Sequence, residues 1–459
     1  MLLGLLFLLF LLQVMSTLLF TRPKKRTRQS KSHPSPPSSW NDGFAMPAPD
    51  LKRAKTKLNS RRHKVVVIGA KECDQHIPVK ASQQATFDTV AAYGLLNHGV
   101  RRIAPKLASL SKMNDFHSQE YLEILSHEGK DIILDMKKDD NDDEDDEDDA
   151  FISAGLTPSN TFNGMWYYCR LITGATLVAA KELTSSNSTL AINWMGGNSN
   201  AMSDAALGTS YINDTALAIF ALRHKFQKIA VIDLSATHPL AIQDAFYYTG
   251  NVFTVSVHRY EKNHDTYGTG RRKDKGAEGE GRHTNLNVNM SIGATDTNLL
   301  DVIKEIAAGL AETYKPECVI LTVGTNSLSG GISKLNYTPV GMATAVDHLL
   351  KVLDVPTLLL GGDNTWRGKS KCAQHARLWT LVVDAAVNAT KGVVSTLPND
   401  IPDEDNPSWN LMGPSFELRE EDDEEEKKTS ETNDNTTQMN VKLNGIRERF
   451  RKYKRTTGL

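Results

Sequence analysis

The sequence predicts an α/β fold: a three-layer α/β/α domain around a central, mainly parallel sheet. Between about residues 64 and 391, short apolar runs alternate with longer amphipathic stretches of helical periodicity. The apolar runs are continuous rather than alternating, which is typical of parallel strands buried on both faces. No break in composition divides this region, and 459 residues are enough for one large α/β domain.

Each predicted strand is a short run rich in Val, Ile and Leu that ends in a turn or a polar loop. The six strands are KVVVIGA (64–70), TLAINWM (189–195), KIAVIDL (228–234), NVFTVSV (251–257), ECVILTV (317–323) and PTLLLGG (356–362). The stretches between them place apolar residues three and four positions apart, as helices packed on a sheet require. The predicted helices cover 87–99, 165–183, 213–226, 298–314 and 342–353, with a shorter one at 239–248.

Composition is that of an ordinary globular protein, with 40% hydrophobic and 24% charged residues. The formal net charge of −2 favours neither nucleic acid nor membrane, so we expect no direct contact with nucleic acid. The four cysteines, Cys73, Cys169, Cys318 and Cys372, are widely spaced and form no CxxC pair. This spacing argues against a disulfide framework or a cysteine zinc site, and for a reducing compartment.

Residues 1–20 contain no charged residue and are long enough to cross a bilayer as a helix. The basic sequence RPKKRTR follows at 22–28 and would keep the domain behind such an anchor on the cytosolic side. Three interpretations stay open: a membrane anchor, a cleaved secretory signal that lacks the usual basic start, and a misassigned start with translation from Met15 or Met46.

Low-complexity sequence flanks and interrupts the domain, which we expect to span 64–415. Residues 21–63 are basic and rich in Ser and Pro, which predicts a disordered linker. The acidic insertion DDNDDEDDEDD at 139–149 is interpreted as a solvated surface loop, with the alternative that it attracts basic tails such as those of histones. Residues 416–459 read as a charged tail with a second acidic run and a short basic helix.

Polar loops follow four of the predicted strands, where open α/β sheets place their chemistry. They are GGNSNAMSDAALG (196–208), DLSATH (233–238), GTNSLSGG (324–331) and GGDNTW (361–366). The chain has no phosphate-binding loop, no dinucleotide fingerprint after the first strand, and neither HExxH nor GxSxG. We therefore expect these four loops to build a joint pocket at one edge of the sheet.

The segments around these loops resemble the class I histone deacetylase family, which has an arginase-like α/β fold. AINWMGG, YINDTALAI, VSVHRY, YGTG, SLSGG, LLLGG and ARLWT occur in the family's order, and LPNDIPDEDNPSWNLMGPSFEL and LNGIRERFRKY resemble its closing segments. The match runs from about Lys64 to Arg449. The resemblance implies a zinc-dependent hydrolase that removes acetyl groups from lysines of proteins, histones included.

The sequence departs from the family where the chemistry lies. The resemblance places the three zinc ligands, two aspartates and a histidine, at Ser235, Thr237 and Asn326. The paired histidines that act as general base and acid fall on Ser199 and Asn200, and the transition-state tyrosine near Thr365 or Trp366. The aromatic walls that hold the acetyl-lysine stem fall on Thr209 and Thr266, and the rim aspartate near Pro158.

These replacements predict the loss of hydrolysis. Zinc requires anionic or imidazole ligands at roughly 2 Å, whereas hydroxyls stay protonated at neutral pH and an amide carries no charge. Without the metal, no bound water has its pKa lowered toward about 7, and without the histidines no group accepts its proton. We therefore expect no zinc and no other cofactor.

Two further polar residues near the predicted pocket have simpler interpretations. Asp233 is expected to bond the turn backbone or to line a structural site for a monovalent cation, and His238 to be an ordinary polar loop residue. A rearranged metal site made of Asp204, His238 and Asp363 is the alternative.

The retained scaffold predicts a role in binding partner proteins. Class I deacetylases work in co-repressor assemblies, some with an inositol phosphate at the contact. Lys80 falls where the family keeps a lysine for that phosphate, but Ile332 replaces the matching arginine, so Lys80 is interpreted as a solvated surface residue.

The sequence thus predicts a catalytically inactive histone deacetylase homologue that is a structural or regulatory subunit of a chromatin-modifying or co-repressor complex. Its expected partners are proteins, including an active deacetylase paralogue and histone tails, in the nucleus or cytoplasm. Two alternatives stay open: a divergent, active lysine deacetylase with a rearranged metal site, and a module that reads acetyl-lysine without cleaving it. Loss of both aromatic walls argues against the second.

Overall fold

The computed structural model describes residues 65–69, 80–97, 100–127, 152–157, 160–264, 266–362, 369–392, 396–419 and 433–458. Every described residue belongs to one compact unit, which lies within residues 51–459. The hydrophobic segment 1–20, the basic linker 21–63 and the acidic insertion 139–149 lie outside the described residues. Within the described part of the chain, no helix has the length and apolar character needed to span a membrane.

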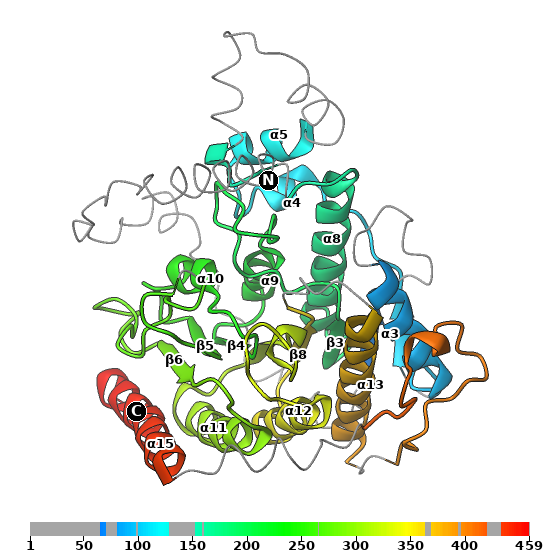
Figure 1. Ribbon diagram of the computed structural model, residues 1–459. Helices are drawn as coiled ribbons and strands as arrows, with labels where there is room; N and C mark the ends of the chain where they lie inside the picture. Colours follow the sequence, from blue (N-terminus) through cyan, green and yellow to red (C-terminus); the bar gives the residue numbers. More distant parts are fainter. Residues whose placement is uncertain are drawn as a thin grey trace, which may run out of the picture. The chain divides into compact units, whose positions relative to one another are not determined.

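An eight-stranded, all-parallel sheet forms the centre of the described domain (Figure 1). The order across the sheet is β2-β1-β3-β8-β7-β4-β5-β6. The strands are β1 (Val65–Ile68), β2 (Val100–Ile103), β3 (Leu190–Asn193), β4 (Ile229–Asp233), β5 (Val252–Arg259), β6 (Asn285–Met290), β7 (Cys318–Thr322) and β8 (Thr357–Leu360). All six predicted strands are present, and the predicted fold class is confirmed.

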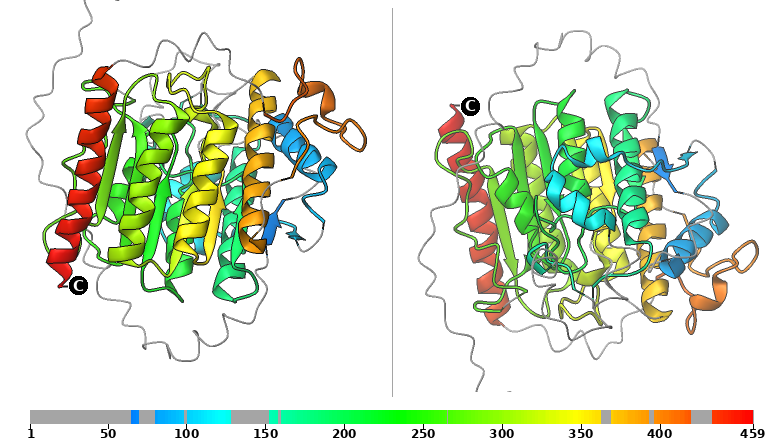
Figure 2. Two further views of the ribbon diagram at one scale, coloured as in Figure 1. Left: turned by 90° about the horizontal axis from the view of Figure 1, so that it is seen from below. Right: turned by 90° about the horizontal axis from the view of Figure 1, so that it is seen from above.

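Helices cover both faces of the sheet (Figure 2). One face carries α3 (Lys80–Ala92), α11 (Asp296–Gly309), α12 (Pro339–Leu353), α13 (Lys369–Lys391) and α15 (Asn433–Thr457). The other carries α4 (Leu110–Met113), α5 (Gln119–His127), α8 (Met165–Thr184), α9 (Asp214–Arg223) and α10 (Leu240–Ala245). A π-helical turn (Leu310–Tyr314) extends α11, and short 3₁₀ turns lie at Thr325–Ser327 and Trp409–Leu411.

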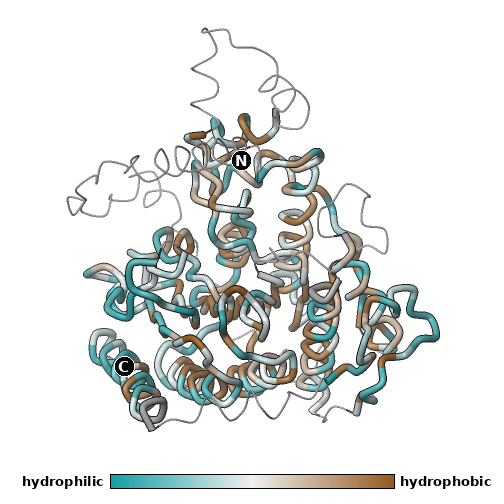
Figure 3. Tube along the Cα trace, in the orientation of Figure 1, coloured by the Kyte–Doolittle hydropathy of each residue, from teal (hydrophilic) through white to brown (hydrophobic). Residues whose placement is uncertain are grey.

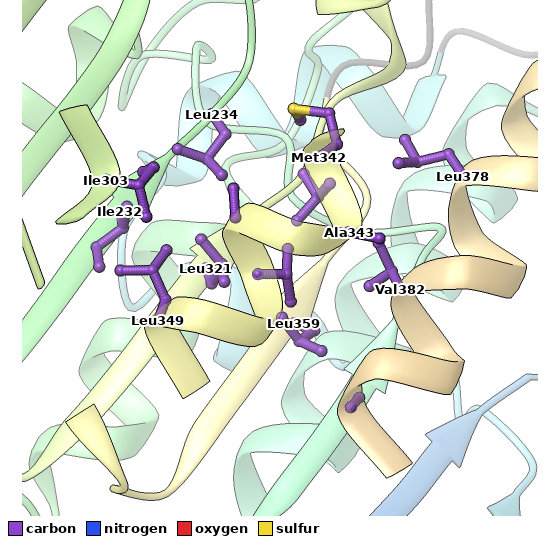
Figure 4. Packing of buried hydrophobic residues seen from close by; sticks show 14 of the residues in the cluster. Ile232, Leu234, Ile303, Leu321, Met342, Ala343, Leu349, Leu359, Leu378 and Val382 are labelled. Carbon is purple, nitrogen blue, oxygen red and sulfur yellow. The ribbon is translucent and has the colours of Figure 1, made fainter. Parts of the chain in front are cut away.

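Each central strand buries side chains toward both helical layers, which explains why its sequence is continuously apolar. In β4, Ala230 and Ile232 join the core under α11, α12 and α13, whereas Ile229 and Val231 join the core under α8 and α9. Figure 4 shows the first of these cores, in which strand residues such as Ile232 meet side chains from α11, α12 and α13.

Two observed strands lie outside the predicted set, and both are at the edges of the sheet. β2 has the sequence VRRI, and its two arginines are exposed to solvent. β6 has the sequence NLNVNM, in which asparagine alternates with apolar residues. Edge strands have one unpaired side and tolerate such polar residues, so a search for continuous apolar runs does not detect them.

The closing helix α15 spans 25 residues, longer than the short basic helix expected. It lies beside α11 and the edge strand β6 (Figure 2). Phe450 stacks on Phe253 of β5 with ring centroids 5.5 Å apart, and Tyr453 contacts Phe253 edge-on. A Cβ atom at Gly309 would lie 2.0 Å from Phe450 Cδ2, so α11 and α15 approach closely only because that residue is glycine. The helix is therefore part of the domain core.

Candidate functional site

The four polar loops meet at the carboxyl ends of β3, β8, β7 and β4, which are neighbours in the sheet. Gly362 N donates a hydrogen bond to Gly196 O at 2.9 Å, which joins the loops after β8 and β3. Ser199 Oγ donates to Asp233 Oδ2 at 3.4 Å, which joins the loops after β3 and β4. The convergence expected of these loops is present.

Asp233 organises the turn after β4. Its carboxylate is buried and accepts a hydrogen bond from the backbone of Ser235 at 2.7 Å, in addition to the bond from Ser199. Both bonds are of the kind expected of a carboxylate that holds a turn. The structure therefore shows the turn-bonding role considered for Asp233, while a monovalent cation beside it stays a prediction.

Ser235 and Asn326 lie together around Gly324. A Cβ atom at Gly324 would lie 2.7 Å from Ser235 Oγ and 2.8 Å from Asn326 Oδ1, so both polar atoms crowd one glycine. Asn326 Oδ1 accepts a hydrogen bond from Ala236 N at 3.1 Å. The asparagine therefore ties the loop after β7 to the turn after β4.

Thr237 does not share these bonds. Its side chain is half-buried, and among the described residues its Oγ1 atom has no hydrogen-bond partner although that atom is shielded from solvent. The three positions matched to zinc ligands thus hold two hydroxyls and an amide oxygen, and the amide oxygen already accepts a backbone N–H.

The positions matched to the paired histidines have structural roles in the loops. Ser199 is buried and donates to Asp233. Asn200 Oδ1 accepts a hydrogen bond from Leu240 N at 3.2 Å, which fixes the start of α10. Neither a serine hydroxyl nor an amide accepts a proton near neutral pH, so neither can act as a general base without a partner.

The loop that carries Ser199 is held by Asp214, the first residue of α9. This buried carboxylate accepts hydrogen bonds from Gly197 N at 2.9 Å, Asn198 N at 2.7 Å and Thr176 Oγ1 at 2.5 Å. Burial raises the pKa of Asp214 to about 6, and these hydrogen bonds oppose the rise. Gly197 has a φ of +98°, and a Cβ there would lie 2.5 Å from Gly362 N, so the close approach requires glycine.

His238 faces a second histidine, His258 of β5, with ring centroids 5.0 Å apart. Nε2 of His238 bonds Gln243 Oε1 at 3.1 Å, and Nδ1 of His258 bonds Ser256 Oγ at 2.7 Å. Burial, and then repulsion by His258, lowers the pKa of His238 to about 3. Burial also lowers the pKa of His258 to about 4, so both imidazoles are neutral at pH 7.

This histidine pair is the main feature of the site that sequence reasoning missed. His238 was expected to be an ordinary loop residue, yet it is buried and packed against His258. The signal lies in the strand register: Asp233 pairs with Ser256, and His258 lies two residues further along on the same face of β5.

Other sequence-predicted positions are not brought into this cluster. Thr209, Thr266 and Asp204 are exposed on the surface, and Ile332 is 72% exposed. Pro158, Asp363, Thr365 and Trp366 lie outside the described residues, and α3 begins at Lys80, whose side chain is not described. Within the described ranges, no group of three or more His, Cys, Asp or Glu residues is placed to hold a metal ion.

An eight-stranded parallel sheet between two helical layers, with polar loops gathered at four carboxyl ends, fits the arginase/deacetylase class of α/β fold. Comparison with protein families then gives the family itself. A family model described as the histone deacetylase domain matches residues 76–377, about two thirds of the chain. The chain belongs to the histone deacetylase family, and the resemblance to its class I members is confirmed.

Curated relatives agree with this assignment. The chain is 32% identical to histone deacetylase 8 of Xenopus tropicalis over 346 residues, which is 74% of this chain and 85% of that protein. It is 31% identical to histone deacetylase 8 of Danio rerio over 364 residues, 78% and 89% of the two chains. Probable histone deacetylase 1-B of Xenopus laevis is 29% identical over 354 residues, 76% and 67%.

The residues that the resemblance matches to the family's metal position do not fit zinc. Ser235, Thr237 and Asn326 offer three neutral oxygens, whereas protein zinc sites use thiolate, imidazole or carboxylate ligands. Asn326 Oδ1 also accepts a hydrogen bond from Ala236 N.

Proposed function

We propose that this chain is a catalytically inactive histone deacetylase homologue that acts as a structural or regulatory subunit of a chromatin-modifying or co-repressor complex. The observation that carries the proposal is the coordinated change at one site: Ser235, Thr237 and Asn326 replace the metal ligands, and Ser199 and Asn200 replace the acid–base pair. A single change of this kind can be an adaptation, but five together remove the metal and the proton transfer at once.

The second support is that the scaffold around the site is retained. Asp214, Asp233 and Asn326 hold the loops after β3, β4 and β7 by hydrogen bonds. These three buried side chains are all hydrogen-bonded, and leaving such a group unpaired costs about 1–3 kcal/mol. We infer that the domain is kept for its surface, with protein partners that include an active paralogue or histone tails, in the nucleus or cytoplasm.

The direct test is an activity assay on the full chain with acetyl-lysine peptides, in parallel with a restored variant. The restored variant carries S235D, T237H and N326D together with S199H and N200H. We expect no turnover by the natural chain. Turnover by the natural chain that a chelator abolishes would overturn the proposal and favour the alternative, a divergent active deacetylase.

That alternative has its own control. It places a rearranged metal site on Asp204, His238 and Asp363, so D204N and H238Q would abolish any chelator-sensitive turnover. Within the structure Asp204 is exposed and His238 is buried, and Asp363 lies outside the described residues. Loss of activity in both variants would establish the rearranged site.

The scaffold role is tested by affinity purification of the full chain from its own cells, followed by mass spectrometry. We expect recovery of chromatin proteins, including an active deacetylase. Recovery of the chain alone, under conditions that preserve other deacetylase complexes, would contradict this role.

A further inference from the structure

A strongly basic surface lies at the β6 edge of the domain. It is formed by α15 and by the segment 271–282 between β5 and β6. Residues 433–457 contain seven Lys and Arg against two Asp and Glu, and residues 271–282 contain five against three. Figure 3 shows α15 as largely hydrophilic on the outside of the domain. We call this the basic edge surface, and its cations are Arg271, Arg272, Lys273, Lys275, Arg282, Lys442, Arg449, Arg451, Lys452, Lys454 and Arg455.

The two segments form one continuous surface because Arg449 joins them. Its guanidinium donates hydrogen bonds to the backbone oxygens of Arg272 at 3.0 Å, Asp274 at 3.5 Å, and Asn285. A Cβ atom at Gly445 of α15 would lie 3.9 Å from Arg272 Cδ. The side chain of Arg449 is therefore structural, and the cations around it are held in place by the fold.

The electrostatic environment shows how closely these cations converge. His283 is 5% exposed, and its pKa is lowered to about 4, first by burial and then by Arg449, Lys275, Arg282 and Lys452. Burial and the neighbouring Arg272 lower the pKa of Lys442. Cations from both segments thus repel a common neighbour, His283, while Asp274 and Glu448 attract Arg449.

Part of this charge forms no ion pair within the described ranges. Arg282 pairs with Glu278 at 3.3 Å and Lys452 pairs with Glu448 at 2.6 Å. Arg271, Arg451 and Lys454 are exposed and form no ion pair with any described residue. Like charges held close together on a fixed surface favour binding of an anion, which relieves their repulsion.

Val441 of α15 is 52% exposed, but residues 447–455 expose no apolar anchor of the kind on which protein partners usually dock. The aromatic residues of this part of α15, Phe450 and Tyr453, are both buried against β5. The side chains exposed to solvent between residues 447 and 455 are almost entirely charged. An array of cations without apolar anchors matches the regularly spaced phosphates of a nucleic-acid backbone.

We propose that the basic edge surface binds the phosphate backbone of double-stranded DNA without reading base sequence. The proposal runs counter to the expectation drawn from the net charge of −2. The net charge is a sum over an uneven distribution, because the acidic runs 139–149 and 420–426 carry 17 of the 55 Asp and Glu residues. The proposal holds whether or not the chain is catalytically inactive.

The test is binding of the full chain to two unrelated DNA duplexes of about 25 base pairs, measured by fluorescence anisotropy between about 50 and 200 mM salt. We expect equal affinity for both duplexes and a steep loss of affinity with salt. The variant R271E/R451E/K454E is expected to bind at least about 10-fold more weakly, with a salt slope shallower by about three. Arg449 is left unchanged because it is structural.

The matched control is K106E/K112E/K181E, which makes the same change in net charge at exposed lysines near α4 and α8. It is expected to keep the natural affinity, and circular dichroism confirms that both variants are folded. A second control, K24E/K25E/R26E, changes the basic segment near the N-terminus.

Three results would overturn the proposal. The first is that the natural chain does not bind the duplexes. The second is that the test variant and either control lose the same amount of affinity for DNA. The third is that the natural chain binds a polyglutamate peptide more tightly than DNA. The last would identify an acidic protein as the partner.

Discussion

The contact between the loops after β3 and β8 leads to a stability prediction that is independent of catalysis. At Gly197, φ is +98°, and a Cβ atom would lie 2.5 Å from Gly362 N and 3.0 Å from Leu360 Cβ. Gly208 also has a positive φ, +63°, but a Cβ there would meet no described atom within 4 Å. Gly197→Ala therefore adds steric overlap to backbone strain, whereas Gly208→Ala adds strain alone.

The magnitudes follow from these two effects. Left-handed backbone costs a residue with a side chain roughly 1–2 kcal/mol. Forcing an extra methyl into a packed site costs about 1–3 kcal/mol more. Gly197→Ala is therefore expected to lower the free energy of unfolding by about 2–5 kcal/mol, and Gly208→Ala by about 1–2 kcal/mol.

The assay is urea unfolding followed by tryptophan fluorescence. Trp194 and Trp379 are buried with ring centroids 6.3 Å apart, so their emission reports on this part of the core. The midpoint of the Gly197→Ala variant should fall well below that of the Gly208→Ala variant. Equal midpoints would refute the close contact between the two loops.

Three further predictions concern the site and the closing helix. Asn326→Ala leaves Ala236 N without its acceptor and should cost about 1–3 kcal/mol in thermal unfolding; an unchanged melting temperature would show that Asn326 does not tie the loops. The pKa of His258 is lowered from 6.5 to about 4, so the folded chain binds this proton less readily than the unfolded chain does. The neutral histidine therefore makes its full contribution to the free energy of unfolding above pH 6.5. That contribution is lost as the pH falls toward 4, with about 2 kcal/mol lost at about pH 5. His258→Asn should therefore flatten the pH dependence of the urea midpoint between about pH 7 and 5, and an undiminished slope would contradict the buried, neutral state. Phe450→Ala should cost about 3–5 kcal/mol because the ring stacks on Phe253, whereas Lys454→Ala at an exposed position should cost almost nothing; similar melting temperatures for both would show that α15 is not part of the core.

The central sheet was predictable because burial on both faces leaves a clear signal in the sequence. β4 and β7 are apolar at nearly every position, and each apolar side chain enters one of the two cores. The edge strands β2 and β6 lack that signal because their polar side chains reach solvent or other polar groups. The first predicted helix, 87–99, is displaced from α3, which ends at Ala92 just before Gly94 with a φ of +68°. A glycine that terminates a helix was the sequence signal for that boundary.

The site was predictable in outline, because parallel strands bring their carboxyl ends to one edge. Ser199, Asp233, Ser235 and Asn326 lie together as expected from that rule. The packing of His238 on His258 was not predictable from spacing alone, since it depends on the register of β5 against β4. Thr365, near which the transition-state tyrosine position was predicted, lies outside the described residues.

The most direct test of the central claim is the zinc content of the full chain, purified without chelator and equilibrated with zinc before removal of the unbound metal. Three neutral oxygens at Ser235, Thr237 and Asn326 predict far less than one bound zinc per chain. The variant S235D/T237H/N326D serves as the comparison, since it restores two carboxylates and an imidazole. One zinc per natural chain, lost on changing any of these three residues, would contradict the account.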